Sequence, residues 1–208
     1  MQAEVARLSY CEQCRLFLIS GIRISYLIMA MKFERTEIEG VMRVLPRLHQ
    51  DERGIFRRTF CQEELAKGDI YAQIIQVNIS ENPKCHTLRG LHYQLSPFEE
   101  QKLITCISGE IFNIVLDLRP KSSTYRRWTT VTLCSVKRDS LFIPTGCANG
   151  FLTMKPDSSL LYLMGAPFNE AAYRGIRYND PQFGFKWPCA PECISKRDQS
   201  FPDFKLEQ

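Results

Sequence analysis

The sequence predicts a mainly β protein, an antiparallel sandwich or barrel with one or few short helices. Short apolar runs recur along most of the chain at intervals of about 8–12 residues, which is typical of such folds. Turn residues separate these runs, among them Gly109, Pro120 and Pro144. The expected strands cover residues 41–45, 55–60, 71–77, 102–107, 111–118, 128–133, 140–143, 150–154 and 160–163.

One segment, residues 61–67, suits a short helix. Glu63 and Glu64 come early in it and Lys67 comes late, an order of charges that favours the helix dipole. After Pro167 the chain becomes rich in aromatic residues and proline, and we expect a loop-like tail that packs on the barrel. Its aromatic residues are Tyr173, Tyr178, Phe183, Phe185 and Trp187.

Residues 1–31 differ from the rest of the chain. The apolar run 16–31 contains Arg23 and is too short and too interrupted to span a bilayer. No clear small-x-small cleavage site follows it, which argues against a signal peptide. We therefore expect residues 1–31 to be an extension, either disordered or an upstream-start artefact, and residues 32–208 to form one domain with no membrane partner.

Composition narrows the class of protein. The chain is 44% hydrophobic and 24% charged, which is enough for one sizeable core. Its net charge of +4 comes without a long Lys/Arg run, so it argues against a nucleic-acid partner and suits an anionic small substrate. The nine cysteines are odd in number and scattered, and we interpret them as reduced thiols of a cytoplasmic protein.

The most informative stretch is Arg-Gly-Leu-His-Tyr-Gln at residues 89–94. In an extended strand, strict alternation places Gly90, His92 and Gln94 on one face and Arg89 on the other. An imidazole and an amide beside a glycine that leaves room for a ligand indicate a binding site. The alternative is a surface strand with one ordinary histidine.

The spacing of the three histidines argues against a metal site. His86 and His92 are not a close His-x-His pair, and His49 lies far upstream. A metal-free role suits His92 better. It would be a general base, oriented by a carboxylate, near a cation such as Lys102 that stabilises an oxyanion.

Several blocks of the sequence follow one another within the range from about residue 32 to residue 198: residues 51–54, 76–80, 88–94, 102–103, 115–119, 143–151 and 175–181. Together they resemble the dTDP-4-dehydrorhamnose 3,5-epimerase family. The resemblance implies a metal-free, cupin-type antiparallel jelly-roll barrel, usually a homodimer, that needs no cofactor. The implied substrate is a nucleotide-diphosphate 4-keto sugar, a 4-keto-6-deoxyhexose with dTDP as the expected nucleotide.

The resemblance also implies an isomerase of deoxysugar biosynthesis. A ketone at C4 acidifies the protons on C3 and C5, so a base can remove one and leave an enolate, and an acid can return a proton on the opposite face. The base would be His92, with Asp198 holding its tautomer. Lys102 would stabilise the enolate oxygen, and Tyr162 would be the acid on the far face.

Four further residues match positions that surround the nucleotide diphosphate in the family: Arg53, Gln76, Asn78 and Arg89. Arginine suits phosphate because its planar donors can bind two oxygens at once. For Arg89 to share the site with the histidine, the strand needs an end or a bulge at Gly90.

Three residues depart from the family pattern. Asn149 stands where the family usually has histidine, and it can bond a sugar hydroxyl but cannot titrate. Phe168 stands where tyrosine is common, and Arg58 where glutamate is common near the base. We expect Asn149 and Phe168 to contact substrate. Two alternatives to the 3,5-epimerase stay open, an epimerase acting at one carbon only and a non-catalytic barrel that binds a sugar nucleotide.

Overall fold

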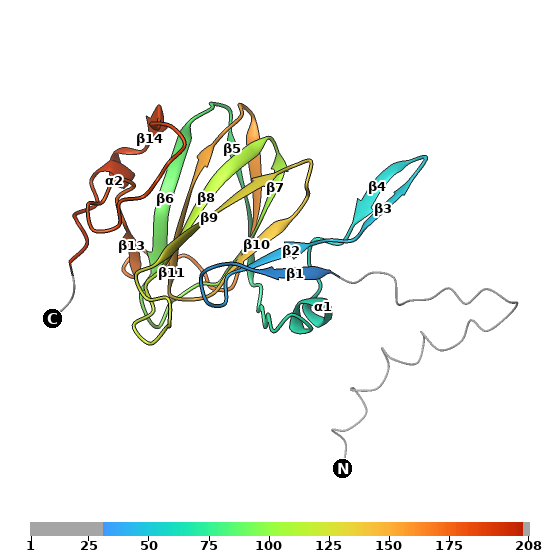
Figure 1. Cartoon of the computed structure of the whole chain (residues 1–208), viewed down its shortest axis with the longest axis horizontal. Helices are drawn as coiled ribbons and strands as arrows, with labels where there is room; N and C mark the ends of the chain where they lie inside the picture. The colour runs from blue at the N-terminus through green and yellow to red at the C-terminus, as the bar shows by residue number, and fades with distance from the viewer. Residues whose placement is uncertain (1–30, 206–208) are drawn as a thin grey trace, which may run out of the picture.

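The structure, a computed structural model, describes residues 31–205 (Figure 1). The predicted extension thus lies outside the described residues, except for Met31. Neither helix in the described range has the length and apolar character needed to cross a membrane.

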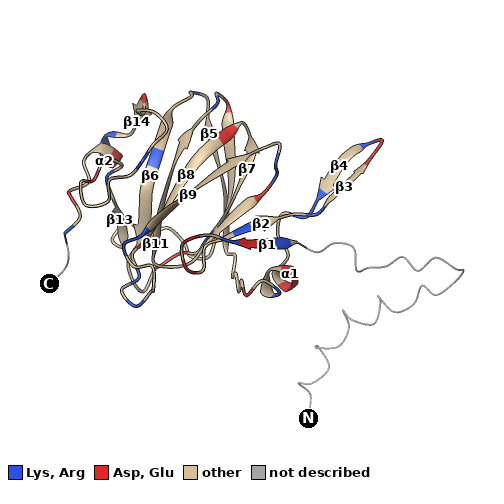
Figure 2. Cartoon of the chain, in the orientation of Figure 1, with Lys and Arg blue, Asp and Glu red and all other residues tan. Residues whose placement is uncertain are grey.

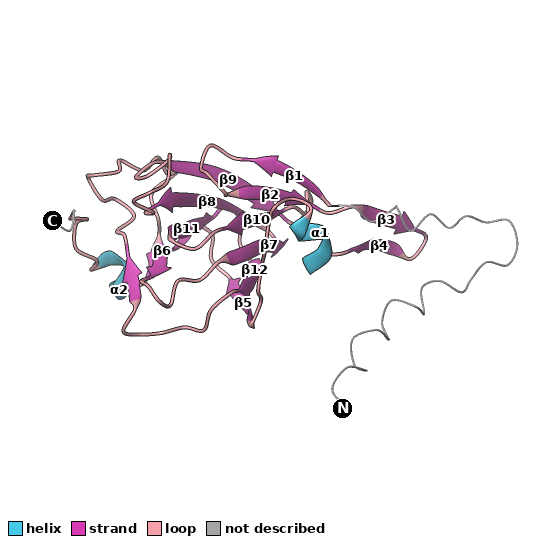
Figure 3. Ribbon diagram, turned by 90° about the horizontal axis from the view of Figure 1, so that it is seen from below, coloured by secondary structure: helices cyan, strands magenta, loops and turns pink. Residues whose placement is uncertain are grey.

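Two six-stranded sheets form the body of the molecule and face each other as two layers (Figures 1 and 3). The first sheet runs in the order β1 (Lys32–Arg35), β2 (Met42–Leu45), β10 (Ser140–Ile143), β7 (Lys102–Ser108), β12 (Ser158–Met164) and β5 (Gln76–Asn82). The second runs in the order β13 (Tyr173–Gly175), β6 (Thr87–Gln94), β11 (Cys147–Thr153), β8 (Glu110–Asp117) and β9 (Trp128–Cys134), with β14 (Cys193–Ile194) beside β6. Only the β14–β6 pair is parallel among the strands described.

The smaller elements lie outside the two sheets. A two-stranded hairpin projects from the body on the side away from the C-terminal helix, as Figures 1 and 3 both show. Lysine and arginine are interspersed with aspartate and glutamate over the strands and the hairpin (Figure 2). The hairpin strands are β3 (Leu48–Asp51) and β4 (Gly54–Arg57), and the helices are α1 (Gln62–Ala66) and α2 (Lys196–Gln199).

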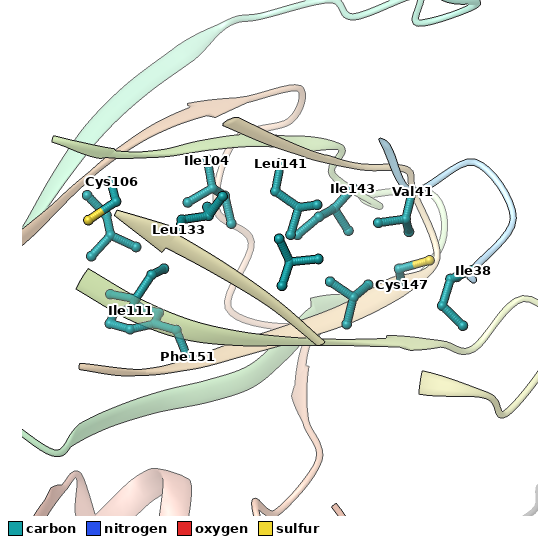
Figure 4. Packing of buried hydrophobic residues seen from close by; sticks show 13 residues of the cluster. Ile38, Val41, Ile104, Cys106, Ile111, Leu133, Leu141, Ile143, Cys147 and Phe151 are labelled. Carbon is teal, nitrogen blue, oxygen red and sulfur yellow. The ribbon is translucent and has the colours of Figure 1, made fainter. Parts of the chain in front are cut away.

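The main hydrophobic core lies between the two sheets (Figure 4). Ile104 of β7 and Leu141 of β10 enter it from the first sheet, and Ile111, Leu133 and Phe151 enter it from the second. All five are buried. Alternation along each strand sends these side chains inward, which is why the apolar runs of the sequence have the strand period.

The aromatic tail covers the outer face of the second sheet. Phe183, Phe185 and Trp187 pack against Leu91 of β6 and Ile114 of β8. The prediction that this tail packs on the barrel is confirmed. Both faces of β8 are therefore covered, one by the core and one by the tail.

The predicted fold class is confirmed: the described chain is mainly β and antiparallel, and α1 lies within the expected helix at 61–67. The strand expected at 71–77 is wrong, because β5 begins at Gln76 and runs beyond the expected end. Ala72 and Ile74 instead pack in the cluster of buried residues around α1. The alternation of buried side chains at residues 72 and 74 reflects this packing and not the pairing of a strand within a sheet.

Two other expected strands have different bounds. The one at 55–60 ends at Arg57 and belongs to the projecting hairpin. The one at 150–154 begins earlier, at Cys147, so that Asn149 lies within β11. This shift places Asn149 opposite His92 of β6 in the register of the second sheet.

Candidate functional site

A cavity of about 310 Å³ opens between the two sheets. Strands β5, β7 and β12 of the first sheet and β6, β11 and β13 of the second contribute to its wall. Its volume is in the lower part of the range typical of small-molecule sites. Most of the predicted site residues line it: Gln76, Asn78, Arg89, His92, Lys102, Asn149, Tyr162 and Phe168.

A bulge in β6 brings Arg89 and His92 to the same cavity. His92 pairs with Asn149 and Arg89 pairs with Phe151. An advance of three residues along β6 therefore lies opposite an advance of two residues along β11, which defines a bulge in β6. The expectation of strict alternation, with Arg89 on the face opposite His92, is therefore wrong. Gly90 permits the bulge, since its φ is +111° and an added Cβ would lie 2.6 Å from the Cα of Gly150.

His92 and Asp198 form a dyad across 106 residues of sequence. Asp198 Oδ1 lies 2.8 Å from His92 Nε2, and Asp198 Oδ2 accepts a hydrogen bond from the Gly90 N–H at 3.1 Å. Ser195 caps α2 by accepting from the Asp198 N–H, which fixes the position of the carboxylate. Asp198 is buried.

The charge state of Asp198 follows from these contacts. Burial alone would raise its pKa, but the hydrogen bond and charge of His92, together with the Gly90 N–H, outweigh burial and lower the pKa. An ionised Asp198 accepts a hydrogen bond from the Nε2–H of His92, and the neutral imidazole then carries its lone pair on Nδ1. No hydrogen bond from the residues described here engages Nδ1, so that nitrogen is available as a base.

The ammonium of Lys102 lies beside the dyad strand. It donates to the backbone oxygen of His92 and to Asn149 Oδ1, each at 3.1 Å, and it lies 3.0 Å from Glu100 Oε1. Lys102 and Glu100 are both buried. Glu100 also lines the cavity, and the sequence interpretation missed it. Its signal was the spacing Glu100-x-Lys102, which places both side chains on one side of an extended chain.

Tyr162 lies in the middle of β12, between β5 and β7. Its ring packs against the main core, and it lines the cavity from the first sheet, whereas His92 lines it from the second. Burial raises the pKa of the Tyr162 hydroxyl, and the charge of Arg89 opposes this only in part. The hydroxyl therefore keeps its proton and can act as a donor.

Tyr173 is a further cavity residue that the sequence interpretation treated only as part of the packed tail. Its ring lies 5.2 Å from the His92 ring, measured between centroids, and the guanidinium of Arg197 lies 3.8 Å from its centroid. Phe168, 56% exposed, meets the Tyr173 ring edge-on at 5.4 Å. Two aromatic rings thus line the cavity next to the dyad, and one of them, Tyr173, also contacts a cation.

Gln94 holds the segment that carries Phe168. Its side-chain amide donates to the backbone oxygens of Phe98 and Pro167 and accepts from the Asn169 N–H. The loop on both sides of Phe168 is therefore bound to β6. Gln94 was expected to face the site, and it lines the cavity.

The polar end of the cavity is formed by β5 and β6. Gln76 donates to Asn78 at 3.1 Å, and Arg89 Nε donates to Asn82 Oδ1 at 2.8 Å. Arg89 is exposed, and its other guanidinium nitrogens are not used in that bond. This end presents donors of the kind that bind phosphate.

The other two histidines lie apart from the dyad. His86 Nδ1 pairs with Glu192 at 2.7 Å, and His49 lies on hairpin strand β3. Within residues 31–205 no three side chains of histidine, cysteine, aspartate or glutamate are grouped so that they could hold a metal ion.

Comparison with known proteins decides the family. A profile of the dTDP-4-dehydrorhamnose 3,5-epimerase family matches residues 35–206, most of the chain. The chain belongs to this family.

Relatives of this epimerase-family chain match over most of their length. The dTDP-4-dehydrorhamnose 3,5-epimerase of Sinorhizobium fredii is 34% identical over 173 residues, which are 83% of this chain and 89% of the relative. Among solved structures, the dTDP-4-dehydrorhamnose 3,5-epimerase of Bacillus anthracis with TDP and PPi bound has a TM-score of 0.82 at 29% identity, covering 84% of this chain and 100% of that chain. A 3'-monoepimerase from Streptomyces bikiniensis in complex with dTDP-quinovose has a TM-score of 0.75 at 28% identity, covering 81% and 85%.

Two predicted site residues of this epimerase-family chain do not line the cavity: Asp198, which contacts the cavity residue His92, and Arg53. Arg53 lies at the tip of the hairpin, where its side chain is 85% exposed and pairs with Asp51. The hairpin projects away from α2 and the dyad (Figure 1). Arg58 also lies outside the cavity, where it pairs with Glu64 of α1. The sequence could not reveal this, because a motif match does not say which way a hairpin extends.

Proposed function

We propose that this chain is an isomerase that epimerises a dTDP-linked 4-keto-6-deoxyhexose at C3, C5 or both. The observation that supports this best is the His92–Asp198 dyad on one sheet and Tyr162 on the other, with Lys102 at the same cavity. A base and an acid on opposite walls suit inversion at a carbon between them, because inversion needs proton removal and return on opposite faces.

The proposed reaction begins at His92. Nδ1 takes a proton from a carbon next to the C4 ketone, and the electron pair of that C–H bond forms a C=C bond while the carbonyl oxygen becomes negative. The charge of Lys102 stabilises this oxygen in a site shielded from water. Asp198 keeps the proton on Nε2 and stabilises the imidazolium, without itself becoming protonated.

Tyr162 completes the proposed reaction from the opposite wall. Its hydroxyl gives its proton to the carbon as the enolate returns to the ketone. The phenolate then regains a proton from water, and His92 releases the proton it took. The substrate loses one proton and gains one, so neither its net charge nor its oxidation state changes. The reaction therefore needs no cofactor.

The nucleotide would bind at the polar end of the cavity. Arg89, Gln76 and Asn78 are placed to contact a diphosphate, and Asn149 and Phe168 to contact the sugar and the nucleoside side. The TDP and PPi of the Bacillus anthracis structure support a nucleotide diphosphate as the ligand class.

A second candidate is an epimerase that inverts one carbon only. The specific observation that favours it is the pair of departures at Asn149, which bonds Lys102, and at Phe168, which has no hydroxyl to offer the cavity. The similarity to a 3'-monoepimerase supports the same alternative.

Deuterium exchange tests these candidates directly. The protein is incubated with a dTDP-linked 4-keto-6-deoxyhexose in heavy water, and label at C3 and C5 is measured by NMR. Label with inversion at both carbons supports the 3,5-epimerase, and label at one carbon supports the mono-epimerase. Tight binding without label would leave only the non-catalytic sugar-nucleotide binder.

We further propose that the protein is a homodimer and that Arg53 serves the cavity of the partner copy. Val77 and Ile79 are exposed on β5, an edge strand of the first sheet, and Phe56 is exposed on the hairpin. Exposed apolar groups on a sheet edge suit pairing with a second copy. Light scattering should give twice the chain mass, and Arg53→Ala should raise KM while leaving that mass unchanged.

We place the reaction in the cytoplasm, in deoxysugar biosynthesis. The cysteines among the described residues are unpaired, which suits a reducing compartment. Fractionation of cells that express the protein with a cytoplasmic marker tests this placement.

A further inference from the structure

Glu100 has no part in the reaction proposed above, yet it contacts the lysine on which that reaction depends. Its Oε1 lies 3.0 Å from Lys102 Nζ. The side chains of both residues are 6% exposed, so the pair is almost fully removed from water. Glu100 also contributes to the cavity wall.

The lysine ammonium is held on three sides. It donates hydrogen bonds to the backbone oxygen of His92 on β6 and to Asn149 Oδ1 on β11, and it forms an ion pair with Glu100 in the connection between β6 and β7. These two hydrogen bonds use two of the three N–H donors of the ammonium. Of the three neighbouring groups, only Glu100 carries a charge, and it alone lies outside a strand.

A contribution to the stability of the fold does not explain the Glu100–Lys102 ion pair well. A buried ion pair seldom stabilises a fold more than apolar residues of the same size do. Here the second oxygen, Glu100 Oε2, is buried and has no hydrogen-bond partner among the described residues, which adds a further cost. Costly buried charges at a cavity wall are typical of functional sites.

We propose that Glu100 is a positioning residue for the enolate-stabilising lysine. Its carboxylate compensates the buried charge of Lys102 and keeps the ammonium at the cavity wall, between His92 and Asn149. Without it, the flexible lysine stem would carry the charge toward water, as long charged side chains do at apolar surfaces. This inference rests on the proposed epimerase reaction and adds a residue to it.

The first test measures exchange kinetics with the dTDP-linked 4-keto-6-deoxyhexose in heavy water. Glu100→Gln keeps the shape of the side chain and an oxygen for Lys102, but it removes the charge. We expect kcat for exchange to fall about 10- to 100-fold with little change in KM, less than the ~10²- to 10³-fold loss typical when an oxyanion donor is removed. Glu99→Gln is the matched control: it makes the same charge change one residue earlier, outside the cavity wall, and should leave kcat unchanged.

The second test asks whether Glu100 acts through Lys102. In a Lys102→Met background, adding Glu100→Gln should cause no further loss of exchange, because the group that Glu100 positions is already gone. If Glu100→Gln instead caused a structural defect, it would lower kcat for exchange by the same factor in the wild-type and the Lys102→Met backgrounds. The double variant also lacks both buried charges, so its folding does not depend on an unpaired one.

The outcomes separate this inference from the proposed function. If the wild-type protein gives no exchange, the proposed function fails. If the wild-type protein exchanges and Glu100→Gln matches it in kcat, the positioning role is wrong. A loss of equal size with and without Lys102 would also overturn that role, since Glu100 would then act independently of the lysine.

Discussion

The two walls of the cavity are held in place by different parts of the molecule. Tyr162 lies in the interior of the first sheet, flanked by strands on both sides and packed on the main core. His92 lies on β6, and its carboxylate partner comes from α2, a four-residue helix near the end of the described chain. The proposed acid therefore depends on the core of the barrel, whereas the proposed base depends on how a short C-terminal segment docks.

This difference predicts that the two proton-transfer groups can be disabled separately. Changes at the tail should weaken the base while the barrel stays folded. Changes around β12 should affect the acid and, when they remove bulk, the stability of the whole domain.

The largest expected effect is the loss of the base. His92→Ala should lower deuterium exchange at C3 and C5 by about 10²- to 10⁴-fold, the range typical of a general base. His86→Ala is the control, because His86 pairs with Glu192 and does not line the cavity. Near-normal exchange in His92→Ala would mean that the mechanism proposed here is wrong.

Loss of the acid should separate exchange from inversion. Tyr162→Phe keeps the ring in the core and removes only the hydroxyl, so we expect net epimerisation to fall about 10²-fold while exchange persists. NMR measures both the deuterium label and the configuration at each carbon, and so distinguishes exchange from net epimerisation. If exchange and inversion fell by the same factor, Tyr162 would be needed for proton removal as well, and the assignment of separate walls would fail.

The dyad should also make stability depend on pH. Because the folded-state pKa of Asp198 is lowered, its ionised form stabilises the fold above the ordinary carboxyl pKa, near 3.9. That contribution is lost as the pH falls through the lower folded-state pKa. Asp198→Asn should thus be less stable than wild type to denaturant at pH 7, by about 1.4 kcal/mol for each pKa unit of lowering, and the difference should shrink by pH 3. A constant difference at both pH values would contradict the ionised dyad.

The smallest expected effect concerns the contact that helps to dock α2. Arg197→Ala removes the cation that lies over Tyr173, which should cost about 0.5–1 kcal/mol at a partly exposed site. Hydrogen exchange should show faster opening of residues 193–200 and unchanged protection of β12. Lys196→Ala, on the same helix, is the control. Equal loss of protection in β12 would show that the walls are not independent.

The fold was largely predictable from the sequence, because alternation of apolar residues reports which side of a strand is buried. The strand expected at 71–77 failed because Ala72 and Ile74 follow the same period while packing around α1. The period of apolar residues alone does not reveal whether these side chains are buried within a sheet or against a helix.

The site was predictable where a motif carried its chemistry, and less so where position depended on distant contacts. His92 and Lys102 line the cavity and Asp198 contacts His92, an arrangement that the resemblance implied. The bulge at Gly90 was expected only because strict alternation conflicts with the role that the resemblance implies for Arg89, and the register shift between β6 and β11 confirms it. Tyr173 was missed because its place beside His92 follows from the pairing of β13 with β6.

His92 and Asp198 lie 106 residues apart in the sequence, so they are synthesised at different times. Chains are synthesised from the N-terminus, and domains can begin to fold during synthesis. The strand that bears His92 and the one that bears Tyr162 therefore both leave the ribosome before α2 does. During that interval the chain carries His92, Lys102 and Tyr162 but lacks the carboxylate that pairs with His92. Asp198 is thus the last of the proposed catalytic residues to be synthesised, and the proposed base is complete only when α2 has docked beside β6.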